Sequence, residues 1–346
     1  MNVRDALGKL VTGGNLTRQE AQDAMRTLVE GEATPSQIAG FAIALRMKGE
    51  TPEEIAGLAE VMRAAATHVE AGDDVIDVVG TGGDGAGTFN ISTMSALVVA
   101  AAGGRVAKHG NRSITSACGA ADFLEAIGIV IDLPPDGVAQ CVKQTGFGFM
   151  FAPLYHPAMR HAIGPRREIG VRTVFNILGP ITNPAGARRQ LTGVAVPGLG
   201  ETIARVLDLM GGLHAMVVHS NDGLDEISVS APTQVHEARE GNVRSYVIEP
   251  EQFGLPRAAP EAVRGGNVDA NVRLANSVLH GERGPARDVV LLNAGAALYV
   301  AGLADSIQSG IQLAGDVLDS GQARQKVEQV AAASQRIKAA AAAEVV

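Results

Sequence analysis

The sequence predicts an α/β protein in which a small N-terminal helical domain precedes a large domain built on a mostly parallel central sheet. Three observations lead to this prediction. Residues 1–72 carry only helix signals, short β-rich runs alternate with helix-like segments from Asp74 onward, and a glycine-rich turn joins the first such run to a helix. Alternation of this kind is typical of parallel sheets covered by helices.

The N-terminal region marks its helices by a repeated pattern. A threonine followed three residues later by Glu or Gln occurs at residues 17–20, 34–37 and 51–54. In such a capping box the threonine hydroxyl accepts from the third helical amide, and the Glu or Gln side chain returns to the amide of the cap. A proline follows the threonine in the last two copies, at the helical position that proline favours. With segment 3–11, the pattern predicts about four short helices and no strand.

The remainder of the chain alternates between strand-like and helix-like segments, beginning with a β-rich run that leads directly into Gly80. Residues 157–190 look helical and loop-rich, so we expect them to pack on the helical domain. We place the helical domain at 1–72 and the α/β domain at 73–346. The expected strands are 75–79, 105–108, 147–151, 192–196 and 215–219, and the expected helices are 91–102, 120–127, 288–300 and 327–342.

The charge and aromatic content argue against a nucleic-acid partner. Of the 346 residues, 37 are acidic and 29 are basic, which gives a net charge of −8, and there are 8 Phe, 3 Tyr and no Trp. A chain of this composition lacks both the positive field and the aromatic side chains on which bases stack.

No membrane or secretion signal is expected either. The longest apolar stretch, residues 294–304, is too short to cross a bilayer, and residues 1–14 contain no apolar core of a signal peptide. Cys118 and Cys141 form neither a disulfide framework nor a zinc-binding set. We therefore expect a soluble cytoplasmic protein with no membrane partner.

A glycine-rich loop follows the first expected strand and precedes a helix. Five of the eight residues 80–87 are glycine, in a chain whose 42 glycines already exceed the ~7% of an average protein. Glycines let the backbone adopt positive φ and bring its amides close to a ligand. Amides near a helix N-terminus favour an anion, so the loop predicts a phosphate site rather than a plain turn.

A dinucleotide-binding fold is the natural competitor, because Gly80, Gly82 and Gly85 satisfy G-x-G-x-x-G. That interpretation requires an acidic residue about 20 positions later to hold a ribose hydroxyl. Residues 85–121 contain no Asp or Glu, although they contain Arg105, Lys108, His109 and Arg112, and no Walker motif is present. The segment therefore suits several negative charges rather than a diol.

The second expected strand ends in a basic, hydroxyl-rich run at residues 108–116. Adjacent strand ends at one edge of an open sheet are where α/β proteins bind ligands. Lysine provides a point charge for phosphate, and hydroxyl groups provide hydrogen-bond donors. We expect this run to lie beside the glycine-rich loop and to share its anion.

These motifs together resemble the anthranilate phosphoribosyltransferase family, enzymes of tryptophan biosynthesis. The resemblance covers essentially the whole chain, and its motifs occur in the family's order. They lie at residues 80–84, 90–93, 108–112, 166–168, 172–180, 183–184, 225–226 and 284–302.

The resemblance implies a fold and a reaction. The family is similar in fold to pyrimidine nucleoside phosphorylases, with a helical and an α/β domain, and usually forms a homodimer. The reaction moves the phosphoribosyl group of 5-phosphoribosyl 1-pyrophosphate to the amine of anthranilate, giving N-(5-phosphoribosyl)anthranilate and pyrophosphate. The implied cofactor is Mg²⁺, with two ions per active site. Such catalysis consists mostly of positioning and charge stabilisation.

Carried over by position, the resemblance also implies site residues. The metal ligands would be Ser92, Asp225 and Glu226, and anthranilate would contact Gly80, Asn111 and Arg166. Lys108 and His109 would be the catalytic residues, although an acid–base role for His109 stays open because an aromatic amine is already a usable nucleophile. Phosphoribosyl pyrophosphate would be bound by Gly80, Gly83, Asp84, Thr88, Asn90, Ile91, Ser92, Thr93, Lys108, His109, Gly110, Asn111, Arg112, Ser113, Ile114, Thr115, Ser116 and Ala120.

Two details qualify this set. The position of Ala120 is commonly a serine in the family, so only the backbone amide can donate to phosphate here. Among the arginines, Arg166 is expected to pair with the anthranilate carboxylate through its bidentate fork, whereas Arg167 and Arg172 are expected to be structural.

Two alternatives stay open beside the family's reaction. A pyrimidine nucleoside phosphorylase-like enzyme shares the fold and also cleaves the anomeric bond, but it would lack the adjacent acids Asp225 and Glu226. A non-catalytic, nucleic-acid-binding relative would carry a basic groove, against which the net charge of −8 argues.

Overall fold

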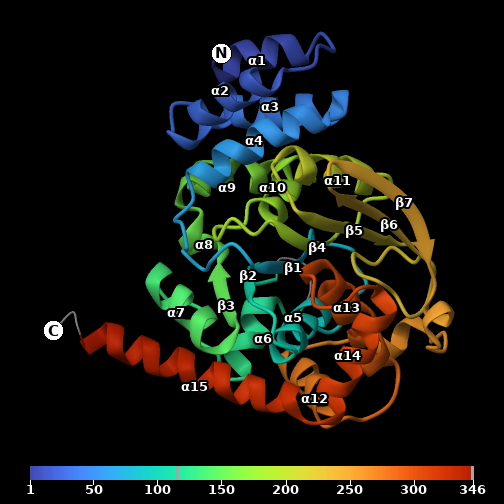
Figure 1. Ribbon diagram of the computed structural model, residues 1–346. Coiled ribbons are helices and arrows are strands. Elements are labelled where there is room, and N and C mark those ends of the chain that lie inside the picture. The colour runs from blue at the N-terminus through green and yellow to red at the C-terminus, as the bar shows by residue number, and fades with distance from the viewer. Residues whose placement is uncertain (114–116, 344–346) are drawn as a thin grey trace.

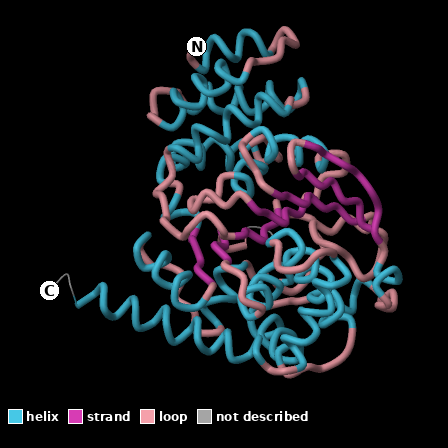
Figure 2. Tube along the Cα trace, in the orientation of Figure 1, coloured by secondary structure: helices cyan, strands magenta, loops and turns pink. Residues whose placement is uncertain are grey.

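The computed structural model describes residues 1–113 and 117–343, so the predicted contacts of Ile114, Thr115 and Ser116 lie outside the described residues. The N-terminal helices form one end of the molecule, and the larger part is built around a twisted sheet (Figure 1). The strands run through the middle of this part, with helices on both faces (Figure 2). The predicted fold class is confirmed.

The N-terminal part consists of α1 (Val3–Leu10), α2 (Arg18–Val29), α3 (Pro35–Lys48) and α4 (Pro52–Ala64). All three predicted capping boxes form, at the starts of α2, α3 and α4. In the first of them the Thr17 hydroxyl accepts from the Glu20 amide at 3.2 Å, while the Glu20 carboxylate accepts from the Thr17 amide at 2.8 Å. Each box satisfies amides that a helix start otherwise leaves unpaired.

One hydrophobic cluster joins these helices to three later ones, namely α9 (Arg160–Ile169), α10 (Phe175–Ile181) and α11 (Gly200–Leu209). Helix α9 packs on α2 and α3, and α10 packs on α4. The cluster also contains Val217 of the sheet, so the helical part shares its core with one sheet face. Residues from the segment 157–190 thus pack against the N-terminal helices.

Seven strands form one sheet in the order β3-β2-β1-β4-β5-β6-β7. The first five are parallel, and β6 and β7 form an antiparallel hairpin at one edge. The chain order reverses between β1 and β4, and open α/β sheets bind ligands at the carboxyl ends of strands at such a reversal. The strands are β1 (Ile76–Gly80), β2 (Val106–Gly110), β3 (Phe147–Phe151), β4 (Arg189–Gly193), β5 (His214–Ser220), β6 (Thr233–Arg239) and β7 (Asn242–Ile248).

Two features of the sheet differ from the prediction. The strand expected at 192–196 lies at Arg189–Gly193 instead, and at its end Gly193 leaves room for the backbone carbonyl of Asp225. The hairpin of β6 and β7 was not expected. Strand β7 is mostly exposed, and its sequence NVRSYVI lacks the continuous apolar character of the buried strands.

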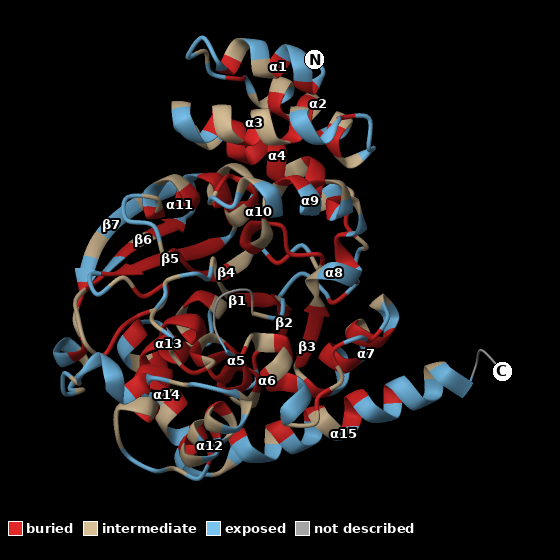
Figure 3. Ribbon diagram, turned by 180° about the vertical axis from the view of Figure 1, so that it is seen from behind, coloured by how far each residue is buried: buried red, intermediate tan, exposed pale blue. Residues whose placement is uncertain are grey.

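Helices also cover the second face of the sheet. The hydrophobic core on this side contains residues of both α5 (Ile91–Ala101) and α13 (Pro285–Ala301). Helix α13 packs on α5 and on α14 (Ile307–Asp319), and α15 (Gln322–Ala343) packs on α7 (Pro135–Thr145). Buried residues concentrate in the strands and in these central helices, while α15 keeps one exposed side (Figure 3). The remaining helices are α6 (Ala120–Ala126), α7 (Pro135–Thr145), α8 (Ala152–Tyr155), α12 (Val268–Leu279), α14 (Ile307–Asp319) and α15 (Gln322–Ala343), with short 3₁₀ turns at Pro157–Met159, Pro250–Phe253 and Pro260–Val263.

Among the described residues, no helix combines the length and the apolar character needed to span a membrane. The predicted helices at 91–102, 120–127, 288–300 and 327–342 all occur, each within a few residues of the expected bounds.

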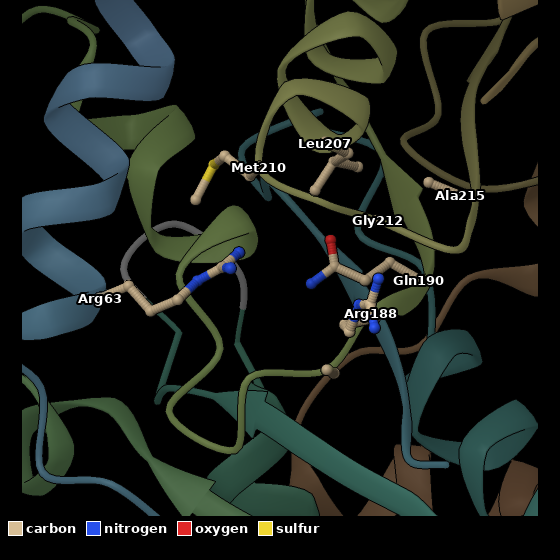
Figure 4. A pocket seen from close by; sticks show the side chains of 8 residues that line it. Arg63, Arg188, Gln190, Leu207, Met210, Gly212 and Ala215 are labelled. Carbon is tan, nitrogen blue, oxygen red and sulfur yellow. The ribbon is translucent and has the colours of Figure 1, made fainter. Parts of the chain in front are cut away.

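A small cavity of about 10 Å³ lies between α4, β4 and α11, lined by Arg63, Gln190 and Leu207 among others (Figure 4). Gln190 is buried, and neither of its amide atoms has a hydrogen-bond partner among the described residues. Burial lowers the pKa of Arg63. A cavity of this size has room for about one water molecule. No residue of the predicted site lines it, so it is not a substrate pocket.

The helical part depends on one buried carboxylate. Glu54 is fully buried and accepts hydrogen bonds from the Leu16 and Thr51 amides at 2.8 Å each, and from Lys48 Nζ at 2.8 Å. Removing one partner of a buried ion pair leaves an uncompensated charge, at a cost of about 3–5 kcal/mol. We therefore expect Glu54→Ala to lower the free energy of unfolding by about 3 kcal/mol, measured by urea denaturation followed by circular dichroism.

The adjacent Glu53 is exposed and provides the matched control. Glu53→Ala should change the free energy of unfolding by less than about 0.5 kcal/mol. Equal effects of the two substitutions would contradict a structural role for the buried carboxylate.

Candidate active site

Three segments meet at the carboxyl ends of β1, β2 and β5. They are the glycine loop (residues 80–87), the segment that follows β2, and the loop after β5 that carries Asp225 and Glu226. Strands β1 and β4, where the strand order reverses, lie at the centre of this edge. The structure therefore brings the glycine loop together with the acidic pair Asp225 and Glu226, which is far away in the sequence.

The glycine loop adopts a conformation that few other residues allow. Gly82, Gly83 and Gly85 have φ of 66°, 71° and 73°, in the left-handed region. The Gly82 amide donates to Asp225 Oδ2 at 2.7 Å, and the Ala86 amide donates to Asp84 Oδ1 at 3.2 Å. The loop is thus turned toward the acidic pair.

Two glycines make room for the acidic pair. Gly80 and Gly193 are register partners on β1 and β4. A Cβ atom at Gly80 would lie 2.5 Å from Asp225 Oδ2, and one at Gly193 would collide with the Asp225 carbonyl. Glycine is therefore required at both positions because Asp225 approaches the strand ends so closely.

Asp225 is buried and Glu226 is partly buried, and the pair is electrostatically unfavourable on its own. Burial, together with the nearby Asp84, raises the pKa of Asp225 to about 6, against the opposing effect of the Gly82 amide. The pKa of Glu226 is raised well above its usual value by burial and by Asp225, against the effect of Lys108. Glu226 Oε1 accepts from the Ser92 amide at 3.1 Å, whereas Oε2 is buried and has no partner among the described residues.

The start of α5 is capped by a residue from another loop. Asn90 occupies the N-cap position, but its side chain forms no cap hydrogen bond and donates to Asn271 Oδ1 at 3.0 Å instead. The cap is provided by Glu226, through the Ser92 amide. A carboxylate at a helix N-terminus is favourable because of the helix dipole.

Lys108 lies beneath the acidic pair rather than on the loop surface. It is only 2% exposed, and its Nζ donates to the Val78 carbonyl and to Ser92 Oγ, the latter at 3.4 Å. Burial lowers the pKa of Lys108, while Asp77 and Glu226 counteract this shift. Its charge thus lies between two carboxylates.

Asp77 was not singled out by the sequence, although it is a polar residue inside an apolar strand. It is fully buried; one oxygen accepts from the His109 amide at 3.2 Å, and the other accepts from Asn183 Nδ2 at 2.6 Å. Burial raises the pKa of Asp77 to about 6, against the opposing effect of Lys108. Asp77 therefore connects β1 to β2 and to the loop before β4.

His109 is buried and neutral. Burial and the neighbouring His156 lower its pKa to about 3, and the ring centroids of the two histidines are 4.9 Å apart. His109 Nδ1 lies 3.2 Å from the Gly179 carbonyl, which assigns the proton to Nδ1 and leaves Nε2 as an acceptor without a partner among the described residues. Burial also lowers the pKa of His156 to about 4. Sequence reasoning missed His156, for which it offered no signal.

The described part of the basic run is only partly directed at the glycine loop. Arg112 forms ion pairs of 2.6 Å with both Asp122 and Glu125 of α6, and these pairs raise its pKa. Asn111 Oδ1 accepts from the Arg112 amide at 2.7 Å. Ala120 is the first residue of α6, with Gly119 at the N-cap, so its amide lies at a helix start as predicted.

Other predicted residues lie in the surrounding structure. Thr93 is fully buried in α5, and its hydroxyl has no partner among the described residues. Thr88 forms an isolated bridge with Arg264.

Of the arginines that follow α8, Arg172 contacts the glycine loop. Arg166 of α9 is partly buried, its guanidinium lies 5.9 Å from the centroid of the Phe175 ring, and burial lowers its pKa. Arg167 is exposed. Arg172, which the sequence suggested to be structural, donates from Nη2 to the Gly82 carbonyl in the glycine loop.

Comparisons with known proteins agree with this architecture. Residues 72–324 match the model of the α/β domain of the glycosyl transferase family, and residues 4–66 match the model of its helical bundle domain. A protein of Thermomicrobium roseum named anthranilate phosphoribosyltransferase is 54% identical over 333 residues, which are 95% of this chain and 96% of that protein. The chain belongs to the anthranilate phosphoribosyltransferase family. A relative of the same name from Thioalkalivibrio sulfidiphilus is 52% identical over 331 residues, 95% of this chain and 98% of that protein.

Solved structures of the anthranilate phosphoribosyltransferase family have the same fold. The crystal structure of the enzyme from Thermus thermophilus has a TM-score of 0.91 at 44% identity, covering 96% of this chain and 99% of that chain. The Saccharomyces cerevisiae enzyme, in complex with phosphoribosyl pyrophosphate and magnesium, has a TM-score of 0.87 at 26% identity, covering 96% and 98%. The predicted family and the enzyme class are thereby confirmed.

Proposed function

We propose that this protein transfers the phosphoribosyl group of 5-phosphoribosyl 1-pyrophosphate to the amine of anthranilate, forming N-(5-phosphoribosyl)anthranilate and pyrophosphate in tryptophan biosynthesis. The main supporting observation is that, at the strand reversal, Asp225 contacts the glycine loop and Glu226 contacts the start of α5. A phosphate-binding backbone and a pair of metal-binding carboxylates on one edge of the sheet suit a donor that is itself a magnesium–pyrophosphate complex.

We propose that the glycine loop and the start of α5 hold the donor. Left-handed glycines expose backbone amides, and the positive end of a helix adds to their attraction for phosphate. Gly83, Asp84 and Asn90 lie in this segment. The residues after β2, including Asn111 and Ser113, and the amide of Ala120 form the opposite wall of the proposed site.

The acidic pair fits Mg²⁺. Among the described residues, no three His, Cys, Asp or Glu side chains are arranged to hold a metal by themselves. Mg²⁺ usually takes only one or two carboxylates together with substrate phosphates and water. Glu226 Oε2 lacks a protein partner, and burial and charge repulsion raise the pKa of both acids, as expected of groups that await a cation. Ser92, Asp225 and Glu226 would hold the metal, with two ions per site, and bound Mg²⁺ would neutralise charge on the leaving pyrophosphate.

Lys108 and His109 have supporting roles in this proposal. The Lys108 ammonium lies below the loop and lowers the pKa of both Asp77 and Glu226, against the larger upward effect of burial. His109, with its pKa lowered to about 3, is neutral at physiological pH and is unsuited to protonate or deprotonate a reacting group there. Its Nε2 can accept a hydrogen bond from a substrate amine.

Arg166 is the proposed partner of the anthranilate carboxylate, with Asn111 and Gly80 nearby. A charge-assisted hydrogen bond in a partly dry site contributes about 1.5–3 kcal/mol. We expect Arg166→Ala to raise the KM for anthranilate about 10- to 100-fold and to leave the KM for phosphoribosyl pyrophosphate nearly unchanged. Steady-state kinetics with each substrate varied in turn measures both constants.

Arg167→Ala is the matched control, because Arg167 is the next residue and is exposed. It should leave the KM for anthranilate within about twofold of the wild type. If the two variants behave alike, or if Arg166→Ala weakens the pyrophosphate substrate instead, the acceptor site lies elsewhere.

The proposed reaction is tested by the fluorescence of anthranilate, which is lost when the amine is ribosylated. Loss of fluorescence should require both phosphoribosyl pyrophosphate and Mg²⁺, and chelation of the metal should stop it. Phosphorolysis of a pyrimidine nucleoside in place of this transfer would support the phosphorylase alternative instead.

Three further predictions accompany the reaction, of which the homodimer rests on the family resemblance and the other two rest on the sequence pattern. We propose a homodimer, a cytoplasmic location and a division into domains at 1–72 and 73–346. Sedimentation analysis tests the homodimer: a single species of 35.6 kDa would contradict it.

A further inference from the structure

Arg172 lies in the short connection between α9, which carries Arg166, and α10. The connection is anchored, because the Thr173 amide donates to Asn176 Oδ1 at 3.0 Å and Thr173 is buried. From this fixed position the Arg172 side chain reaches to the glycine loop, where Nη2 donates to the Gly82 carbonyl. The three heavy atoms nearest to a Cβ placed on Gly83 all belong to Arg172, so its guanidinium lies directly against the loop.

Gly82 is held from both sides. Its amide donates to Asp225 Oδ2 at 2.7 Å, and its carbonyl accepts from Arg172. Gly82 and Gly83 have φ of 66° and 71°. Glycine adopts positive and negative φ about equally readily, so its own preference does not fix these values. A loop so rich in glycine has much conformational entropy to lose, so its ordered form requires restraints from outside the loop. Asp225 supplies one restraint and Arg172 supplies the other.

Arg172 has no carboxylate partner among the described residues. The Arg172 guanidinium has five N–H donors. Among the described residues it makes one hydrogen bond, which is to the Gly82 carbonyl. By contrast, Arg112, in the segment that follows β2, forms ion pairs with two acids of α6. A cation without an acidic partner, placed against a loop of left-handed glycines, has a role at that loop rather than in a surface ion pair.

We propose that Arg172 is a positioning residue for the phosphoribosyl donor. It holds Gly82 and Gly83 in the conformation that presents the loop amides to the donor's phosphates. Because it does so from the segment that follows the acceptor helix α9, it also links the placement of the donor site to that of the acceptor site. This inference rests on the proposed function for its kinetic consequence, although the restraint on the loop exists in the substrate-free protein.

The test compares the wild type with Arg172→Met, which keeps the length of the side chain but removes its donors, and with Arg172→Lys. Hydrogen exchange of residues 82–87 is measured in the substrate-free full chain by mass spectrometry. We expect exchange to accelerate about tenfold in Arg172→Met and less in Arg172→Lys. The KM for phosphoribosyl pyrophosphate should rise about tenfold in Arg172→Met and partly recover in Arg172→Lys, while the KM for anthranilate should change less than threefold. Arg167→Met, on the exposed neighbour, should leave exchange and both KM values unchanged.

Different failures have different meanings. Wild-type exchange in Arg172→Met would overturn the inference, even if the KM for phosphoribosyl pyrophosphate rises, because the arginine would then contact the substrate without ordering the loop. A selective rise in the KM for anthranilate would overturn it as well. Wild-type protein that fails to consume anthranilate would refute the proposed function, whereas accelerated exchange in that case would still support the restraint on the loop.

Discussion

Replacing Gly83 with valine is expected to lower kcat/KM for phosphoribosyl pyrophosphate by about 100-fold. Gly83 has a φ of 71°, where a β-branched residue is strongly disfavoured. A side chain there would also collide with the guanidinium of Arg172. Backbone strain of this kind costs about 1–3 kcal/mol, and each ~1.4 kcal/mol is a factor of ten, before the collision is counted. Steady-state kinetics on folded protein measures the loss.

Gly13 provides the matched control for this substitution. It has a φ of 81° in the helical part, and no atom lies within 4 Å of a Cβ placed there. Gly13→Val should therefore carry a similar backbone strain without any loss of kcat/KM. Wild-type kinetics in folded Gly83→Val would show that the glycine loop does not bind the donor.

Removing the charge of either acid should have the second large effect. Asp225→Asn and Glu226→Gln keep the shape of the side chain but weaken its affinity for Mg²⁺. We expect each substitution to reduce kcat by at least about 100-fold, which is the loss typical when a charge-stabilising group is removed. A high concentration of Mg²⁺ should restore part of the activity.

The same substitutions should not destabilise the protein. Burial and mutual repulsion raise the pKa of both acids, so the ionised pair is unfavourable in the metal-free fold. Asparagine at 225 can still accept the hydrogen bond of the Gly82 amide. The Tm without metal should therefore stay equal or rise while activity falls, as is common when a strained functional group is relieved.

Asp222 lies in the same loop and is exposed, so Asp222→Asn is the control. Its amide can still accept from the Ser228 hydroxyl, which the carboxylate meets at 2.7 Å. Normal activity and normal metal dependence are expected. Turnover that needs no metal in the wild type would refute the assignment of Asp225 and Glu226.

Much of the fold was predictable because local signals agree with tertiary structure. The capping boxes at Thr17, Thr34 and Thr51 form as the sequence suggests. The hairpin of β6 and β7 was not predictable, because its strands carry polar side chains on a partly exposed edge and lack an apolar run. The close approach of Asp225 to Gly193 at the end of β4 involves a residue from a distant loop, and no local sequence pattern indicates such a contact.

The site could be predicted only in outline. The glycine loop was visible from its composition, but the roles of Asp225 and Glu226 were implied by the family resemblance, since adjacent acids in a loop have no distinctive pattern. The burial of Lys108 and His109 beneath the loop could not be inferred from a run that looks basic and exposed. Asp77 offered a weak signal as an acid within an apolar strand, and the position of Arg172 against the glycine loop offered none.

The central claim is that Asp225 and Glu226 hold the metal that binds the donor at the glycine loop. Anomalous diffraction from crystals soaked with Mn²⁺ and phosphoribosyl pyrophosphate tests it most directly. We expect a manganese peak about 2.0–2.3 Å from a carboxylate oxygen of one of these residues, with the pyrophosphate between the metal and the amides of residues 82–87. A peak remote from both acids, or a pyrophosphate bound away from the glycine loop, would contradict the assignment.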